Sequence, residues 1–186
     1  QAQFALDDFQ YQDRGSPDRY PDRWALTLTA FGPIGRTLSW QALYTQASTL
    51  AFRSVSPFDN YVDADVGIGR GFPDMDRLFV AVTVPVAQRF TFTPDVTLQR
   101  QGAARLTDPF PTPDEAGATP AFLSDPVETT WRVGFTLSGR TGPLDLQAVA
   151  GVHHRTNADN IAGTSSTRFE GRIQATLGLR GRGILD

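Results

Sequence analysis

Residues 130–153 read TWRVGFTLSGRTGPLDLQAVAGVH, and this stretch decides the fold. In 130–138 and again in 144–153 every second residue is apolar, and most of the residues between are polar. A period of two is that of a β-strand, whose successive side chains point to opposite faces, and the helical period of 3.6 does not fit. The connection between the two segments is short: it has only the four residues 139–142, and two of them are glycines. The stretch therefore predicts an antiparallel hairpin with one apolar and one polar face.

The same alternation recurs along the rest of the chain. It predicts further strands at 24–31, 37–47, 78–84, 90–99 and 168–179, and a less regular strand at about 3–11. With the hairpin these segments make eight strands. Pro94 lies inside one of them and cannot donate to the ladder, so we expect a bulge or a shortened strand there.

The connections between these segments alternate in length. Short links at 32–35, 85–88 and 139–142 alternate with long polar ones at 12–23, 48–77, 101–128 and 155–166. A further strand pair near 61–68 would fit inside the second long connection. This rhythm predicts an antiparallel up-and-down sheet with short turns on one side and long loops on the other, which is the arrangement of outer-membrane barrels.

Composition limits the class of protein. A chain of 186 residues is a single domain by default, and 40% hydrophobic residues exclude a disordered chain. The absence of cysteine excludes a disulfide scaffold and thiolate metal sites, and a net charge of -3 argues against broad nucleic-acid binding. The longest uninterrupted apolar run has five residues, Leu78–Val82, so we expect no transmembrane helix, and we expect no signal peptide.

Two interpretations of the alternation compete. In a soluble sandwich or a lipocalin-like barrel the apolar phase is the core, whereas in a membrane barrel it contacts lipid. The polar phase here carries mainly Thr, Ser and Gln, all 17 basic residues are arginine, and there are only three glutamates. A solvated face usually carries Lys and Glu in quantity. We therefore expect an all-β, antiparallel, up-and-down transmembrane β-barrel of about eight strands, forming one domain over residues 1–186. The alternative is the C-terminal part of a larger barrel.

Two sets of side chains follow from the barrel interpretation. Charged residues of the polar phase have mixed signs and are expected to form a polar network in the barrel interior: Asp95, Arg132, Asp145, Glu170 and Arg172. Aromatic residues lie toward the strand ends and are expected at the membrane interfaces: Trp24, Tyr44, Phe90, Trp131 and Phe169.

Other features suggest chemistry only weakly. Several aspartates of one long connection could hold Ca²⁺ through hard oxygen ligands, although no EF-hand spacing is present: Asp59, Asp63, Asp65, Asp74 and Asp76. His153 and His154 are adjacent and would point to opposite faces of a strand, so they cannot share a metal ion. Gly67, Gly69 and Gly71 lack the spacing and the strand-to-helix context of a phosphate loop.

The segments FALDDFQYQD, RWALTLTAFGPIGRTLSWQALYTQ and RFEGRIQATLGLRG resemble outer-membrane β-barrel proteins of the Wzi-like capsule-assembly family. The resemblance implies a barrel with about twice as many strands, of which this chain would be the C-terminal half, or else a reduced relative. It also implies a role in anchoring capsular polysaccharide at the cell surface. The chain departs from the usual pattern of such barrels because it ends LGLRGRGILD, without a terminal aromatic residue.

From these observations we expect a non-enzymatic protein of the outer membrane of a Gram-negative-type bacterium, with no cofactor. Its partners would be membrane lipid and, at the loops, surface polysaccharide, lipopolysaccharide or another protein. Two alternatives stay open: a passive pore or a segment of one, and a soluble β-barrel that binds an apolar ligand.

Overall fold

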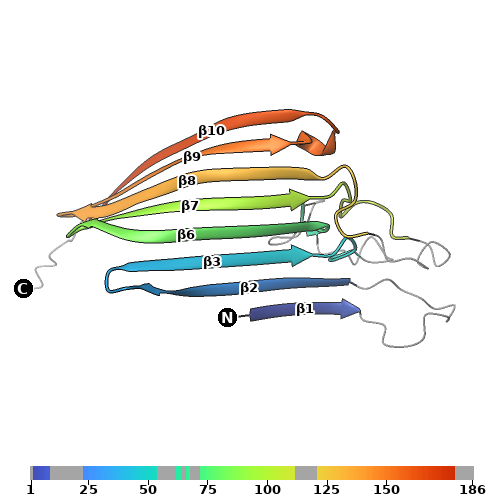
Figure 1. Ribbon diagram of the computed structural model, residues 1–186, viewed down its shortest axis with the longest axis horizontal. Coiled ribbons are helices and arrows are strands. Elements are labelled where there is room, and N and C mark those ends of the chain that lie inside the picture. Colours follow the sequence, from blue (N-terminus) through green and yellow to red (C-terminus); the bar gives the residue numbers. More distant parts are fainter. Residues whose placement is uncertain are drawn as a thin grey trace, which may run out of the picture.

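The computed structural model describes residues 2–8, 23–53, 62–63, 66–67, 72–111 and 121–178. Eight strands form one antiparallel sheet in which each strand pairs with the next strand of the sheet along the chain (Figure 1). The strands are β1 (Ala2–Asp8), β2 (Arg23–Ile34), β3 (Leu38–Ala47), β6 (Met75–Ala87), β7 (Phe90–Gln101), β8 (Glu128–Thr141), β9 (Leu144–Thr156) and β10 (Ser165–Leu177). The prediction of an up-and-down antiparallel sheet is confirmed.

Short turns join the strands at one end of the sheet, and the strand ends that the long connections follow lie at the other end (Figure 1). Positive φ angles at Gly35 and Gly142 close two of the turns, a backbone conformation that glycine adopts without strain. β2, β6 and β8 run three residues beyond the alternating segments at their short-turn ends, and β6 to β10 run two or three residues beyond them at their long-loop ends. There the alternation gives way to polar residues, so the pattern does not reveal the true strand end.

The strand pair expected near 61–68 is present as β4 (Val62–Asp63) and β5 (Val66–Gly67). The β9–β10 connection also contains a short 3₁₀ helix, η2 (Ala158–Asn160), which was not predicted from the sequence. No helix among the described residues is long and apolar enough to cross a membrane.

Pro94 does not shorten β7, and the expected bulge is not there. The strand is continuous, and Pro94 pairs with Phe135 of β8. On its other side, the β6–β7 ladder has no pairs between Ala81–Asp95 and Val84–Phe92. The missing proline N–H is thus accommodated by a local gap in the pairing with β6.

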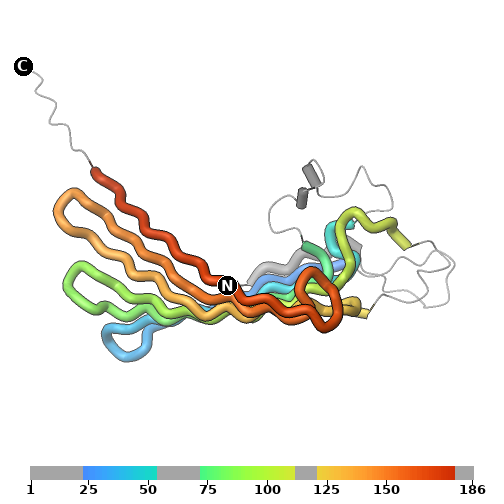
Figure 2. The backbone as a smooth tube through the Cα atoms, turned by 90° about the horizontal axis from the view of Figure 1, so that it is seen from above, coloured from blue at the N-terminus to red at the C-terminus, as the bar shows by residue number. Residues whose placement is uncertain are grey.

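The sheet is open over the residues that the structure describes. β1 and β10 are its two edges, and each has a hydrogen-bonded neighbour on one side only. The sheet twists along the strands, so that the short-turn end is fanned out (Figure 2).

The two faces of the sheet differ in composition and in exposure. On β7, Asp95 and Thr97 of the polar face are 8% and 5% exposed, whereas Val96 between them is 41% exposed. Side chains converge on the concave side of a sheet and diverge on the convex side, so the polar face is the concave one. On the apolar face Val133, Phe169 and Ile173 are 60%, 75% and 86% exposed. No described segment covers that face.

The buried apolar cluster lies at the long-loop end rather than under the sheet. Ala47, Ala51 and Met75 form it, with Ala25 and Phe52 packed against them. The loop segments rise on one side of the sheet at this end (Figure 2). Because Ala25, Ala47 and Met75 belong to the polar, concave phase, the loops fold over the rim of the concave face.

Candidate functional site

Two carboxylates and two glycines form one row across the concave face. Asp95 of β7 pairs with Gly134, Gly134 pairs with Gly151, and Gly151 pairs with Glu170 of β10. Neighbouring strands lie about 4.8 Å apart, so the two acidic residues stand roughly 14 Å apart at their backbones. The glycines leave a flat floor between them.

The side chain of Arg132 lies on this floor. A Cβ added to Gly134 would be 2.7 Å from both Arg132 Nη atoms, and one added to Gly151 would be 3.1 Å from Nη2. Arg132 donates through Nη1 to Asp95 Oδ1 and through Nε to Glu170 Oε1 at 2.6 Å. One guanidinium therefore bridges the carboxylates of β7 and β10 across β8 and β9.

His153 completes the cluster from β9. It pairs with Arg132 in the strand register, and its Nε2 lies 3.0 Å from Glu170 Oε2. His154 points to the other face, where its Nδ1 is 3.0 Å from Thr167 Oγ1. Sequence reasoning placed Glu170 and Arg132 in a network but missed His153 and the two glycines, because their contribution depends on strand register.

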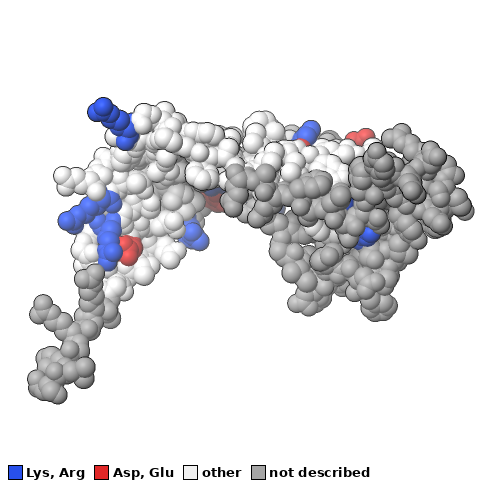
Figure 3. All heavy atoms as spheres, turned by 90° about the horizontal axis from the view of Figure 1, so that it is seen from below, with Lys and Arg blue, Asp and Glu red and all other residues white. Residues whose placement is uncertain are grey.

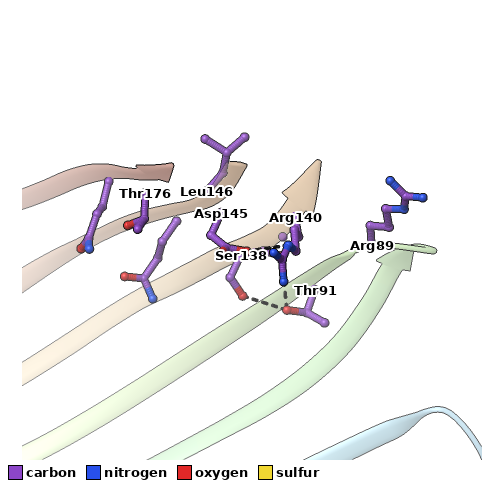
Figure 4. A pocket seen from close by; sticks show the side chains of 10 residues that line it. Arg89, Thr91, Ser138, Arg140, Asp145, Leu146 and Thr176 are labelled. Carbon is purple, nitrogen blue, oxygen red and sulfur yellow. Dashed lines mark hydrogen bonds and ion pairs between the residues drawn. The ribbon is translucent and has the colours of Figure 1, made fainter. Parts of the chain in front are cut away.

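Asp145 and Arg172 share this face but not this cluster. Arg172 donates to Gln147 Oε1 at 3.1 Å, and Asp145 lies 3.5 Å from Arg140 Nε near the short turns. A cavity of about 420 Å³ opens there, between the ends of β7 to β10. Thr91 and Ser138 hydrogen-bond at its floor, while Arg89 extends away from them (Figure 4).

The apolar face ends in an ordered boundary at the long-loop side. One cross-strand row is almost wholly polar and consists of Leu26, Gln46, Asp76, Arg100, Thr129, Thr156 and Ser165. Arg100 binds Asp76 through two nitrogens, with Nε at 2.9 Å from Oδ1. The next row holds Leu28, Tyr44, Leu78, Leu98, Trp131, His154 and Thr167. The row after that is apolar in every strand from β2 to β10.

Tyr44 lies in the second of these rows, and its hydroxyl group reaches the polar row. Its hydroxyl donates to Gln46 Oε1 at 3.0 Å and reaches Asp76 Oδ2 at 3.5 Å, while its ring lies on the apolar face. Tyrosine with one apolar and one polar end is typical of the boundary between an apolar and an aqueous phase.

The other aromatic residues singled out from the sequence lie at different levels of the same face. Trp24 stands one row nearer the long loops than the polar row, and its backbone N–H donates to Ser48 Oγ. Phe169 lies one row inside the apolar zone. Phe90 lies at the short-turn end, with its ring over Gly139.

Loop segments around residues 49, 104 and 124 meet at Asp74, and we call this group the loop cluster. Asp74 lies at its centre and is fully buried. Its Oδ1 accepts hydrogen bonds from Thr49 Oγ1 and from the Leu123 N–H, both at 2.9 Å. Its Oδ2 accepts from the Ser124 N–H and hydroxyl and from the Ala104 N–H. One carboxylate thus joins three loop segments that are far apart in the sequence.

These contacts bear on the calcium candidates. Both oxygens of Asp74 are occupied by protein donors, and Asp76 is occupied by Arg100. Asp63 is described only as part of β4, and Asp59 and Asp65 lie outside the described residues. Within the described part of the chain no three His, Asp or Glu side chains are grouped to hold a metal ion.

Arg53 fastens the same loops by a second route. It is buried, and its Nη2 donates to the carbonyl oxygens of Asp108, at 2.8 Å, and Pro109. Burial lowers the pKa of its guanidinium, and the nearby Asp108 and Asp74 oppose that shift. The long loops are therefore held by polar side chains directed inward.

No protein-family model, curated protein or solved structure matches the chain. The resemblance to the Wzi-like family stays a prediction.

Proposed function

We propose that the chain is a non-enzymatic, membrane-spanning β-barrel of a bacterial outer membrane, whose sheet anchors the long loops at the cell surface. One observation carries the proposal. The exposed face of the sheet changes, row by row, from polar to mixed, with Tyr44 and Trp131, and then to apolar, while the opposite face carries mainly polar side chains. Water on both sides would not favour an uncovered apolar face of this extent.

The height of the apolar zone is consistent with a bilayer. Along β8, Trp131 and Gly139, the partner of Phe90, are eight residues apart. At about 3.3 Å per residue and a strand tilt of about 40°, this separation corresponds to roughly 20 Å along the membrane normal. The apolar band of outer-membrane barrels is about 25 Å tall.

Closure of the barrel would join the two free edges. β1 and β10 run antiparallel because seven antiparallel steps separate them in the sheet. The ladder extends to this edge, where Phe4 of β1 pairs with Leu26 of β2. Pairing of β1 with β10 would place lipid-facing residues on one continuous outer surface.

An anchor is favoured over an open channel. The Arg132 cluster lies across the concave face, and the loops fold over its rim at the long-loop end. The interior of an eight-stranded barrel is just wide enough to be filled by side chains. A passive pore remains the second candidate because a polar cavity of about 460 Å³ lies on the concave face, beside Gln41, Arg77 and Asp95.

Heat modifiability tests the proposal. The chain would be refolded in detergent and run on SDS gels with and without boiling. We expect a compact band that shifts on boiling, because a closed barrel resists SDS until it is heated. A chain that is folded in plain buffer and gives no shift would instead support a soluble β-domain that binds an apolar ligand. Conductance in planar bilayers would then separate anchor from pore.

A further inference from the structure

The short-turn end of the sheet carries one arginine at each of its three hairpins. Arg36 lies in the β2–β3 turn, Arg89 in the β6–β7 turn and Arg140 at the end of β8, and all three are exposed. Basic atoms project from this end of the molecule, with one acidic group among them (Figure 3). We refer to these three residues as the arginine rim.

Within the part of the chain that the structure describes, Arg140 is the only rim residue with an acidic partner. No ion pair in that part involves Arg36 or Arg89. Arg140 contacts Asp145 through Nε at 3.5 Å, and both side chains are more than half exposed. An exposed pair at this distance contributes little, so the Nη atoms of Arg140 remain available to a ligand.

Apolar side chains place the rim at a definite level. Ile34 and Val86, both on the apolar phase and exposed, precede Arg36 and Arg89 by two and three residues. Arg36 and Arg89 therefore stand just beyond the apolar zone, whereas Arg140 lies at the same end of the sheet with its side chain on the concave side, beside Asp145. A guanidinium presents a planar set of donors that matches the oxygens of a phosphate group.

We propose that the arginine rim binds the phosphate groups of anionic phospholipids in the leaflet on the short-turn side. The proposal rests on the proposed membrane function, which sets the rim at headgroup depth. Bilayer insertion brings phospholipid phosphates to the level of the short turns, where all three arginines lie, whereas a free anion would meet each of them separately. In outer-membrane barrels the short turns face the periplasm.

The test compares folding into vesicles of phosphatidylcholine alone and of phosphatidylcholine with phosphatidylglycerol. The variant Arg36→Gln, Arg89→Gln, Arg140→Gln removes the rim. The variant Arg14→Gln, Arg19→Gln, Arg70→Gln removes the same charge from the long connections and is the control. A juxtamembrane arginine strengthens binding to an anionic surface about fivefold, so the rim variant should lose about a hundredfold of the preference for anionic vesicles.

The possible outcomes distinguish the rim proposal from the membrane function on which it rests. Insertion with no preference for anionic vesicles, or equal losses in the two variants, would overturn the rim proposal and leave the membrane function standing. Failure to insert into either vesicle would overturn both. A gain in phosphatidylcholine vesicles on adding inorganic phosphate, at matched ionic strength, would make the free anion the ligand and overturn the lipid assignment.

Discussion

Asp95 and Glu170 stand in one row on either side of β8 and β9, with Gly134 and Gly151 between them, and both accept hydrogen bonds from Arg132. The arrangement fastens β10, an edge strand, to the middle of the sheet through side chains as well as through the ladder. Its stability depends on the space that Gly134 and Gly151 leave for the Arg132 side chain.

Filling that space should destabilise the fold. In Gly134→Ala the new Cβ would lie 2.7 Å from the Arg132 Nη atoms and 2.8 Å from the Ala150 carbonyl oxygen. The backbone oxygen cannot move away cheaply, so we expect a loss of about 1–3 kcal/mol in the free energy of unfolding, measured with urea. Gly178→Ala is the control, because its Cβ would meet only the Pro143 oxygen at 3.6 Å. Equal stability of the two variants would contradict the claim that the fold needs a residue without a Cβ at position 134.

The two carboxylates should differ in their contributions. The side chain of Asp95 is 8% exposed and that of Glu170 is 40% exposed. Removing one partner of a buried pair costs about 3 kcal/mol or more, whereas a solvated pair is worth about 1 kcal/mol or less. We expect Asp95→Asn to lower the free energy of unfolding clearly more than Glu170→Gln. Double-mutant cycles with Arg132→Gln would measure each coupling, and a larger coupling to Glu170 would refute the ranking.

Depth on the apolar face should set the cost of a charge. Val133→Arg places a cation inside the apolar zone, and Thr129→Arg places one in the polar row beside Arg100. In a bilayer the first should cost about 2–4 kcal/mol and the second about 1 kcal/mol or less, measured by urea unfolding from vesicles. If Val133→Arg costs no more than Thr129→Arg, the face does not meet lipid.

The loop cluster should depend on the carboxylate of Asp74. Asp74→Ala leaves the Leu123 and Ser124 N–H groups without their acceptor, whereas Asp74→Asn keeps one side-chain oxygen and tolerates the positive φ of 57°. We expect trypsin to cleave after Arg105 about tenfold faster in Asp74→Ala, with Asp74→Asn in between. Unchanged cleavage in Asp74→Ala would show that Arg53 alone holds the loops.

Barrel closure can be detected by cross-linking because the chain has no cysteine of its own. Ala5→Cys in β1 would be combined in turn with Arg168→Cys, Arg172→Cys and Gln174→Cys in β10. A disulfide requires Cα atoms within about 7 Å, so closure predicts an intramolecular bond for one register. Covalent dimers instead of internal bonds would show that β10 pairs with another molecule.

The sequence predicts the strands well because the alternation of apolar and polar residues is a local property of each strand. It does not depend on how the strands are arranged in the sheet. It predicts residues that share a face, such as Arg132 and Glu170. It does not predict which residues stand opposite one another, since register over four strands depends on every turn between them. The glycine floor and the polar row of Asp76 and Arg100 were missed for that reason.

The contacts of the loop cluster could not be predicted from the sequence at all. Asp74 is one aspartate among many in an acidic connection, and its partners lie in segments around 49, 104 and 124. Hydrogen bonds between irregular segments follow no period in the sequence. The carboxylate therefore looked like a calcium candidate, whereas the structure uses both of its oxygens to hold loops.

The free edge of β10 has a consequence for the behaviour of the chain in water. Over 13 residues this strand has no proline and no lysine, and it displays Phe169 and Ile173 beside an unpaired row of backbone donors and acceptors. Such an edge is a template for the strands of other copies in water. Newly made chain should therefore precipitate readily in aqueous buffer, and delivery to a membrane would call for a carrier that shields this strand.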